Sequence, residues 1–124
     1  EELTLIPDSG GLGQYRGGLG VRRKVSMTGE TEVISMKKKS KTVGWGLDGG
    51  QPSPIKNHMV LRPNTPEEKK VGMYRETLQA GEAFINFSAG GAGWGDPANR
   101  DPDAIAEDIQ DGLTTNCISK MKEK

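Results

Sequence analysis

The chain of 124 residues carries 17 basic and 17 acidic side chains, so its formal net charge at pH 7 is zero. A neutral chain has no overall field that attracts nucleic acid or an anionic membrane, and we expect neither as a partner. Its 18 glycines and 32% hydrophobic residues predict one domain with a thin core that a partner subunit completes.

The cysteine and histidine content limits the metal and redox chemistry of the chain. Cys117 is its one cysteine and His58 its one histidine, which excludes an internal disulfide and favours a reducing compartment. Together they supply at most two of the roughly four ligands that a zinc site needs. The sequence has no apolar run of membrane-spanning length and no signal-peptide pattern, which predicts a cytoplasmic location.

The first third of the chain is predicted to be β-rich. Residues 2–6 (ELTLI) form a short extended run that Pro7 ends. Residues 21–27 and 31–37 then favour β structure, and the loop between them contains glycine. Two such runs joined by a short glycine-containing loop predict a hairpin.

Two further strands and a helix follow. Residues 58–62 and 81–89 are predicted strands, and the charged stretch 63–76 between them is predicted to be an exposed excursion. A helix is predicted to start at Asp101, with a proline in its first turn, and to stop near Gly112. We expect a second short helix over residues 115–121.

These elements predict a mainly β fold with glycine-rich crossovers and one or two short C-terminal helices, which is a β-rich α+β class. We treat residues 1–124 as a single segment, with a β-rich body over 1–100 and a helical tail over 101–124.

The glycine clusters could cradle a phosphate or shape the backbone. No glycine is followed by the Lys-Ser or Lys-Thr pair of a Walker loop, and each start of a G-x-G-x-x-G fingerprint lacks its third glycine. Glycine also lets two backbones approach closely. We therefore expect sharp crossovers at the glycine pairs, which are residues 10–11, 17–18, 49–50 and 90–91.

Several polar and aromatic residues lie beside these clusters. Arg16 and Asp8 flank the first cluster and are predicted to form an internal ion pair, rather than to bind a carboxylate or phosphate ligand. Trp45 and Trp94 are expected to cover backbone turns or anchor a subunit interface, with an aromatic-ketone pocket as the alternative. Asp96 precedes a proline and is predicted to be a turn residue, not an acid or ligand.

The order of three motifs resembles the C-terminal portion of the hydantoinase B/oxoprolinase family. "DSGGLGQYRGGLGV" is similar to the family block D-S-G-G-x-G-x-x-R-G-G-x-G, and "GWGLDGG" to its W-G-x-x-G-G turn. "SAGGAGWGDP" and "RDPDAIAEDIQDG" are similar to T-P-G-G-G-G-Y-G-D-P and R-D-P-x-x-V-x-x-D-V-x-x-G. The resemblance covers nearly all of the chain. Ala89 and Ala92 depart from it, and the residues after Leu113 lack the usual Y-G-V ending.

The resemblance implies a part of an ATP-dependent multisubunit enzyme. The metal-binding residues of the family lie upstream of the matched part, so no catalytic, cofactor-binding or metal-binding residue is assigned to this chain. ATP and a divalent metal are expected in larger hydantoinase A-like and hydantoinase B-like partner subunits. The residues assigned structural or interface roles are Asp8, Arg16, Gly17, Gly18, Trp45, Gly90, Gly91, Trp94 and Asp96.

Within the family, the short chain suggests a small non-catalytic subunit of a biotin-independent ketone carboxylase of the acetophenone type, inactive when isolated. The alternative is a C-terminal fragment of an ATP-dependent 5-oxoprolinase or hydantoinase, which hydrolyses cyclic amides. A sequence that starts at Glu1 without an initiator methionine is compatible with both. A free-standing β-rich binding module is disfavoured, because the predicted core is too thin to fold alone.

Overall fold

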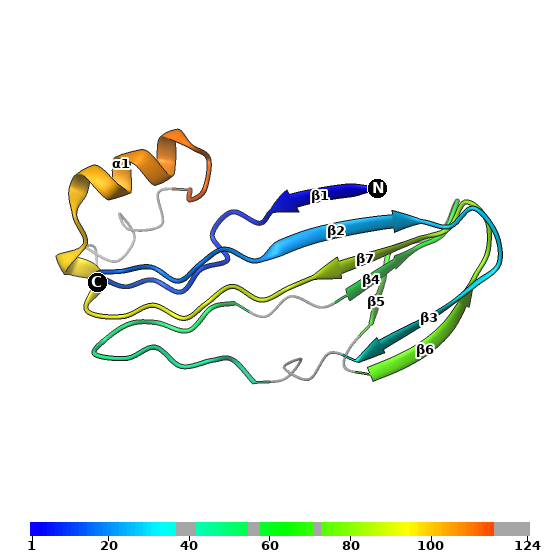
Figure 1. Ribbon diagram of the computed structural model, residues 1–124, viewed down its shortest axis with the longest axis horizontal. Coiled ribbons are helices and arrows are strands. Elements are labelled where there is room, and N and C mark those ends of the chain that lie inside the picture. Colours follow the sequence, from blue (N-terminus) through cyan, green and yellow to red (C-terminus); the bar gives the residue numbers. More distant parts are fainter. Residues whose placement is uncertain (37–41, 55–57, 71–72, 116–124) are drawn as a thin grey trace. The chain divides into compact units, whose positions relative to one another are not determined.

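A computed structural model describes residues 1–36, 42–54, 58–70 and 73–115 of the chain (Figure 1). As predicted, this part is mainly β with one short C-terminal α-helix. The predicted second helix lies, apart from Thr115, outside the described residues. The chain forms two compact units. Unit 1 comprises Glu1–Thr4, Val21–Thr42 and Ile55–Ser88, and unit 2 comprises Leu5–Gly20, Val43–Pro54 and Ala89–Lys124.

Two antiparallel arrangements of strands form most of the regular structure. The five-stranded sheet has the order β1-β2-β7-β4-β5, and the two-stranded sheet pairs β3 with β6 (Figure 1). The strands predicted near residues 2, 21, 31, 58 and 81 are confirmed. The bounds are β1 Glu2–Leu5, β2 Val21–Ser26, β3 Thr31–Met36, β4 His58–Leu61, β5 Glu68–Lys70, β6 Met73–Leu78 and β7 Ala83–Phe87.

The predicted hairpin between β2 and β3 is wrong. β2 pairs with β7, and β3 pairs with β6. Ser26 pairs with Ala83 at the end of the β2–β7 ladder, and Thr31 pairs with Leu78 at the start of the β3–β6 ladder. The same register therefore continues from one ladder to the other. The two connecting loops lie opposite each other and bend a single long ribbon instead of reversing the chain. The corner is held by a hydrogen bond from the Gly81 N–H to the Met27 carbonyl.

The segment 63–76 is not only an exposed excursion, because it contains β5 and the start of β6. Two of its acids are paired within unit 1: Arg62 contacts the carboxylates of Glu68 and Glu76, and the Arg62 Nε also lies 3.2 Å from Glu82. These bonds raise the pKa of Arg62, the Glu76 bond most strongly. Charge along this stretch therefore indicates strands joined by ion pairs rather than a free loop.

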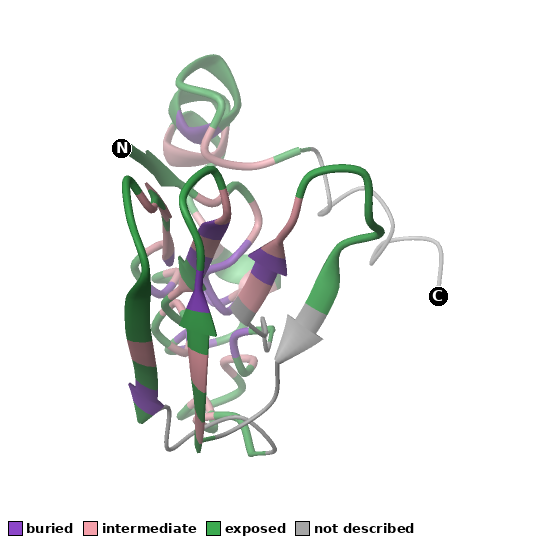
Figure 2. Cartoon of the chain, turned by 90° about the vertical axis from the view of Figure 1, so that its right-hand side faces the viewer, coloured by how far each residue is buried: buried purple, intermediate pink, exposed green. Residues whose placement is uncertain are grey.

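The apolar core lies where the β3–β6 ribbon packs on the larger sheet. The Tyr74 and Phe84 rings meet edge to face with centroids 6.2 Å apart, and Phe84 is the register partner of Val60. Burial changes from residue to residue along β3, β6 and β7, and Figure 2 shows the buried, intermediate and exposed residues as bands on the strands. Among the described residues, the buried hydrophobic side chains are Val60, Leu78, Ala83 and Ile85.

The helix forms as predicted. α1 (Pro102–Gln110) is capped by Asp101, whose carboxylate accepts from the Asp103 N–H at 2.9 Å, and a 3₁₀ turn, η1 (Pro97–Asn99), precedes it. Gly112 follows at φ +69°, which favours glycine at a helix end. No described helix is long and apolar enough to cross a membrane.

Replacing Leu78 with alanine tests the core of unit 1. Leu78 is 0% exposed, so we expect Leu78→Ala to lower the free energy of unfolding by about 2–5 kcal/mol. Ile34→Ala is the matched control, because Ile34 lies on the outer face of the same ribbon and is 60% exposed. Urea unfolding followed by circular dichroism measures both, and equal losses would contradict the assigned faces.

Candidate functional site

Unit 2 is built around backbone rather than around apolar side chains. The residues that it buries are glycines, two serines and one aspartate, and no aliphatic or aromatic side chain of its described part is among them. A unit with this interior must be held by hydrogen bonds and ion pairs, because it gains little from apolar burial. The buried residues are Ser9, Gly10, Gly11, Gly13, Gly17, Gly20, Ser53, Gly93, Gly95 and Asp108.

Backbone segments far apart in the sequence hydrogen-bond to one another in closed cycles. The Gly11 N–H donates to the Gly91 carbonyl, the Gly91 N–H to Gly18, and the Gly17 N–H back to Gly11, at 2.8–2.9 Å. Beside this cycle, Gln51 donates to the Leu12 carbonyl and accepts from the Gly93 N–H. We call this arrangement the glycine bundle, formed by residues 9–20, 45–51 and 90–95.

The glycine bundle has no room for a side chain at several of its glycines. A Cβ on Gly17 would lie 1.9 Å from the Gly91 oxygen, and one on Gly93 would lie 2.1 Å from the Leu12 oxygen. A Cβ on Gly90 would meet the Ser9 oxygen at 2.1 Å. Close approach, not a positive φ, is therefore what requires glycine at these positions.

The backbone amide groups that a phosphate site would need already donate hydrogen bonds within the bundle. The N–H groups of Gly11, Gly17, Gly91 and Gly93 all donate to backbone carbonyls of unit 2. A phosphate site at a glycine-rich loop depends on N–H groups that point at the ligand. This hydrogen bonding supports the architectural interpretation of the glycine clusters.

An aspartate between two arginines ties helix α1 to the bundle. Arg16 binds Asp108 through two parallel bonds, with Nε 2.8 Å from Oδ2 and Nη2 2.7 Å from Oδ1. Arg100 adds a third bond, from Nη2 to Oδ2 at 2.7 Å. Asp108 is only 10% exposed and Arg100 12%, so this cluster, which we call the clamp, is largely screened from water.

The charges of the clamp reinforce one another. The Arg16 bond lowers the pKa of Asp108 below 3.8, opposed by burial and assisted by Arg100. In return, the Asp108 bond raises the pKa of Arg16. Asp108 and Arg16 therefore both favour their charged forms, as paired charges that are largely buried must.

The predicted ion pair between Asp8 and Arg16 is wrong, because each side chain has another partner. The Asp8 carboxylate accepts from the Thr114 hydroxyl at 2.7 Å and from the Thr115 N–H at 2.8 Å. Burial acts to raise the Asp8 pKa, but the Thr115 and Thr114 bonds outweigh it and lower the pKa. Asp8 therefore fastens the segment after α1, and its φ of 58° is one that aspartate tolerates.

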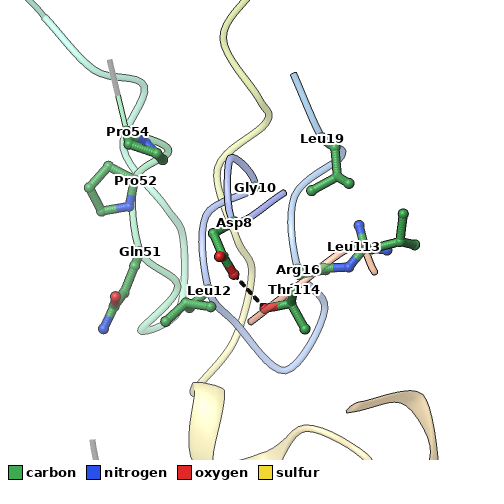
Figure 3. A pocket seen from close by; sticks show the side chains of 10 residues that line it. All are labelled: Asp8, Gly10, Leu12, Arg16, Leu19, Gln51, Pro52, Pro54, Leu113 and Thr114. Atoms are coloured by element: carbon green, nitrogen blue, oxygen red, sulfur yellow. Dashed lines mark hydrogen bonds between the residues drawn. The ribbon is translucent and has the colours of Figure 1, made fainter. Parts of the chain in front are cut away.

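A small pocket opens beside these contacts (Figure 3). Its volume is about 210 Å³, below the roughly 300–1,000 Å³ of typical ligand sites. Figure 3 shows Pro52 on one side, Leu19 and Leu113 on the other, and Asp8 between them. The mixed lining fits one apolar side chain or a small ligand group, and neither tryptophan is among its residues.

All nine predicted site residues fall in unit 2. Gly17, Gly90 and Gly91 take part in the close backbone contacts, whereas a Cβ on Gly18 would meet open space. Asp96 caps η1 by accepting from the Ala98 N–H at 2.9 Å, as a turn residue would.

The tryptophans lie at the surface of unit 2. Trp94 is 45% exposed and stacks at a tilt on Tyr15, with centroids 5.8 Å apart. Trp45 is 80% exposed. Their assignment to a subunit interface stays a prediction.

The structure adds Asp108 and Arg100, which sequence reasoning did not select. Asp108 lies beside Ile109 and one turn after Ile105, on the face that the pattern marked as apolar. An acid on the buried face of a helix requires a cation, and Arg16 and Arg100 are the only cations in the described part of unit 2.

The acids of the described residues do not form a metal site. No group of three or more His, Cys, Asp or Glu side chains lies in a suitable arrangement there. Asp8 and Asp108 are occupied by threonine and arginine donors. The acids that the structure describes therefore do not fit a divalent metal.

Replacing two neighbouring glycines tests the close contacts of the bundle. We expect Gly17→Ala to destabilise the fold by about 3 kcal/mol or more, since overpacking against fixed backbone has no relief. Gly18→Ala, where a Cβ meets open space, should change stability by less than about 1 kcal/mol. Urea unfolding followed by tryptophan fluorescence measures both, and similar losses would contradict the packing.

Asp108→Asn tests the clamp and its pH dependence. At neutral pH we expect a loss of about 2–4 kcal/mol, because two largely buried arginines lose their counter-ion. The pKa of Asp108 is lower in the folded state than in the unfolded state. Its contribution to the free energy of unfolding is therefore full at pH values above the unfolded-state pKa, and it is lost as the pH falls through the folded-state pKa. The stability gap between wild type and variant should therefore be constant above about pH 5 and narrow below pH 4. A gap that stays constant down to pH 2.5 would contradict the assignment.

Comparison with known proteins places this arrangement in a family. The model of the hydantoinase B/oxoprolinase family matches residues 1–97. The uncharacterized protein MJ0963 of Methanocaldococcus jannaschii is 34% identical over 112 residues, which cover 89% of this chain and 19% of that protein. The beta subunit of the caprolactamase of Pseudomonas jessenii is 30% identical over 126 residues, covering 90% and 20% respectively.

A third relative is a subunit of acetone carboxylase. The acetone carboxylase alpha subunit of Xanthobacter autotrophicus is 26% identical over 139 residues, which cover 84% of this chain and 18% of that protein. The chain thus spans about a fifth of the length of these relatives.

Solved structures share the fold. The crystal structure of the ATP-dependent caprolactamase from Pseudomonas jessenii matches with a TM-score of 0.83 and 25% identity, covering 93% of this chain and 21% of that one. The nucleotide-free structure of acetone carboxylase matches with a TM-score of 0.74 and 22% identity, covering 92% and 20%. With the family model matching most of its length, the chain belongs to the hydantoinase B/oxoprolinase family.

Proposed function

We propose that this chain is a structural, non-catalytic part of an ATP-dependent enzyme and that its glycine bundle completes the fold of a larger hydantoinase B-like protein. The observation that carries the proposal is the interior of unit 2, where backbone amides donate to backbone carbonyls, Asp108 binds Arg16 and Arg100, and Asp8 accepts from threonine donors. Groups committed in this way hold a shape and leave little chemistry for a substrate. ATP and its divalent metal are then bound by the hydantoinase A-like and hydantoinase B-like partners.

For the reaction of the whole enzyme, we propose the ATP-dependent hydrolysis of a cyclic amide. The caprolactamase supports this choice, since it is more similar than acetone carboxylase both in sequence, at 30% against 26%, and in fold, at a TM-score of 0.83 against 0.74. A further relative is the B component of a putative D-/L-hydantoinase from a Pseudomonas species, 27% identical over 105 residues. Caprolactam and hydantoin are both cyclic amides.

Carboxylation of a ketone such as acetone or acetophenone is the second candidate. The short length of the chain suggested it, and the similarity to the acetone carboxylase alpha subunit supports it. The two reactions differ in their co-substrates, because carboxylation consumes bicarbonate and hydrolysis consumes water.

The native assembly that contains this chain distinguishes these reactions. We expect ADP release to be stimulated by caprolactam, hydantoin or 5-oxoproline and to be independent of bicarbonate. ADP release that requires both a ketone and bicarbonate would establish carboxylation. If none of these substrates stimulates ADP release, both proposed reactions are contradicted. Within the assembly, Gly17→Ala should abolish activity by releasing the chain, as seen by size-exclusion chromatography, whereas Gly18→Ala should leave it unchanged.

A further inference from the structure

In the two Gly-Trp-Gly stretches of unit 2, Gly46, Gly93 and Gly95 pack against neighbouring atoms, while both tryptophans are exposed. Gly93 and Gly95 are buried, and a Cβ on either would strike the bundle, while Trp94 between them is 45% exposed. A Cβ on Gly46 would lie 2.2 Å from Gly50, and Trp45 before it is 80% exposed. The bundle thereby forces these indole rings to the surface.

Backbone pairing gathers Trp94, Tyr15 and Leu47 on one face, and Trp45 lies two residues before Leu47. Trp94 pairs antiparallel with Tyr15 and parallel with Leu47, and directly paired residues share a side of the ladder. Tyr15 is 64% exposed and Leu47 is 59% exposed. We call Tyr15, Trp45, Leu47 and Trp94 the aromatic face. Exposed tryptophan and tyrosine grouped in this way are typical of interaction surfaces.

Acidic side chains border the aromatic face. Asp48 follows Leu47, and Gly49 after it approaches Asp96, with a Cβ there 3.6 Å from the Asp96 Cα. The described part of unit 2 has eight acids and two arginines, and both arginines bind Asp108. The acids are Asp8, Asp48, Asp96, Asp101, Asp103, Glu107, Asp108 and Asp111.

We propose that the aromatic face docks a segment of the protein partner that carries arginine side chains. Guanidinium groups stack on indole and phenol rings and pair with carboxylates, so one arginine satisfies both the rings and the acids at their border. A second copy of this chain would bring like charges together, which is unfavourable. A purely apolar partner would bury Asp48 and Asp96 without a counter-charge.

The inference rests on the proposed function for the existence of a partner, but not on the reaction that the enzyme performs. Binding to this face is measured on the full chain without any catalytic assay. Failure of the turnover experiment and failure of this inference are therefore separate outcomes.

Short peptides of alternating arginine and leucine serve as the probe. The chain has two tryptophans, so its two indole N–H signals in a nitrogen–proton NMR spectrum report on Trp45 and Trp94 separately. We expect the arginine peptide to shift both signals and to bind about tenfold more tightly than a lysine–leucine peptide of equal length, because the planar guanidinium stacks on the rings better than an ammonium group does. A glutamate–leucine peptide should cause no shift.

Variants with equal charge change locate the binding. Asp48→Asn with Asp96→Asn should weaken the arginine peptide about tenfold, whereas Asp103→Asn with Glu107→Gln should weaken it by less than about twofold. Trp45→Ala should also weaken it, read from the Trp94 signal, and Leu3→Ala in unit 1 should not. Equal effects of the two acidic pairs, equal binding of arginine and lysine peptides, or no binding would each overturn the proposal.

Discussion

Unit 2 depends on the contact of backbones that no side chain separates. Where a Cβ on Gly17 would lie 1.9 Å from a carbonyl oxygen, the neighbouring chain occupies the space that any other residue would fill. The N–H and carbonyl groups brought together in this way bond to one another, which compensates for the missing apolar interior. Two of the buried polar residues, Ser9 and Asp108, extend the same network to the neighbouring loops and to α1.

This constraint also explains how the two units differ. Unit 1 has alternating strands and a small apolar core at Val60, Leu78 and Ile85. Unit 2 instead has an interior of closely packed backbone, to which the clamp ties α1. Such an interior keeps its large side chains outside, which is why Trp45 and Trp94 are exposed. This interior supports the structural role that we propose for the chain.

Local patterns predicted the elements but not their partners. The strand near Ala83 followed from its alternation, and α1 from its Asp-Pro start, because both signals lie within a few residues. The hairpin assignment failed because a short loop with glycine also fits a bent strand, and only the antiparallel partner strands distinguish the two. The Asp8–Arg16 pair failed for a similar reason: proximity in sequence says nothing about Asp108, 92 residues beyond Arg16.

By itself, the sequence determined the mainly β class, the helix and its cap, the thin apolar core and the presence of glycine-built turns. Each of these follows from local propensity, periodicity or composition. The tertiary structure alone decided which strands pair, which acid neutralises Arg16, and which glycines tolerate a side chain. Those outcomes depend on contacts between segments distant in sequence. These contacts form only when the backbones of residues 9–20, 45–51 and 90–95 come together in the fold.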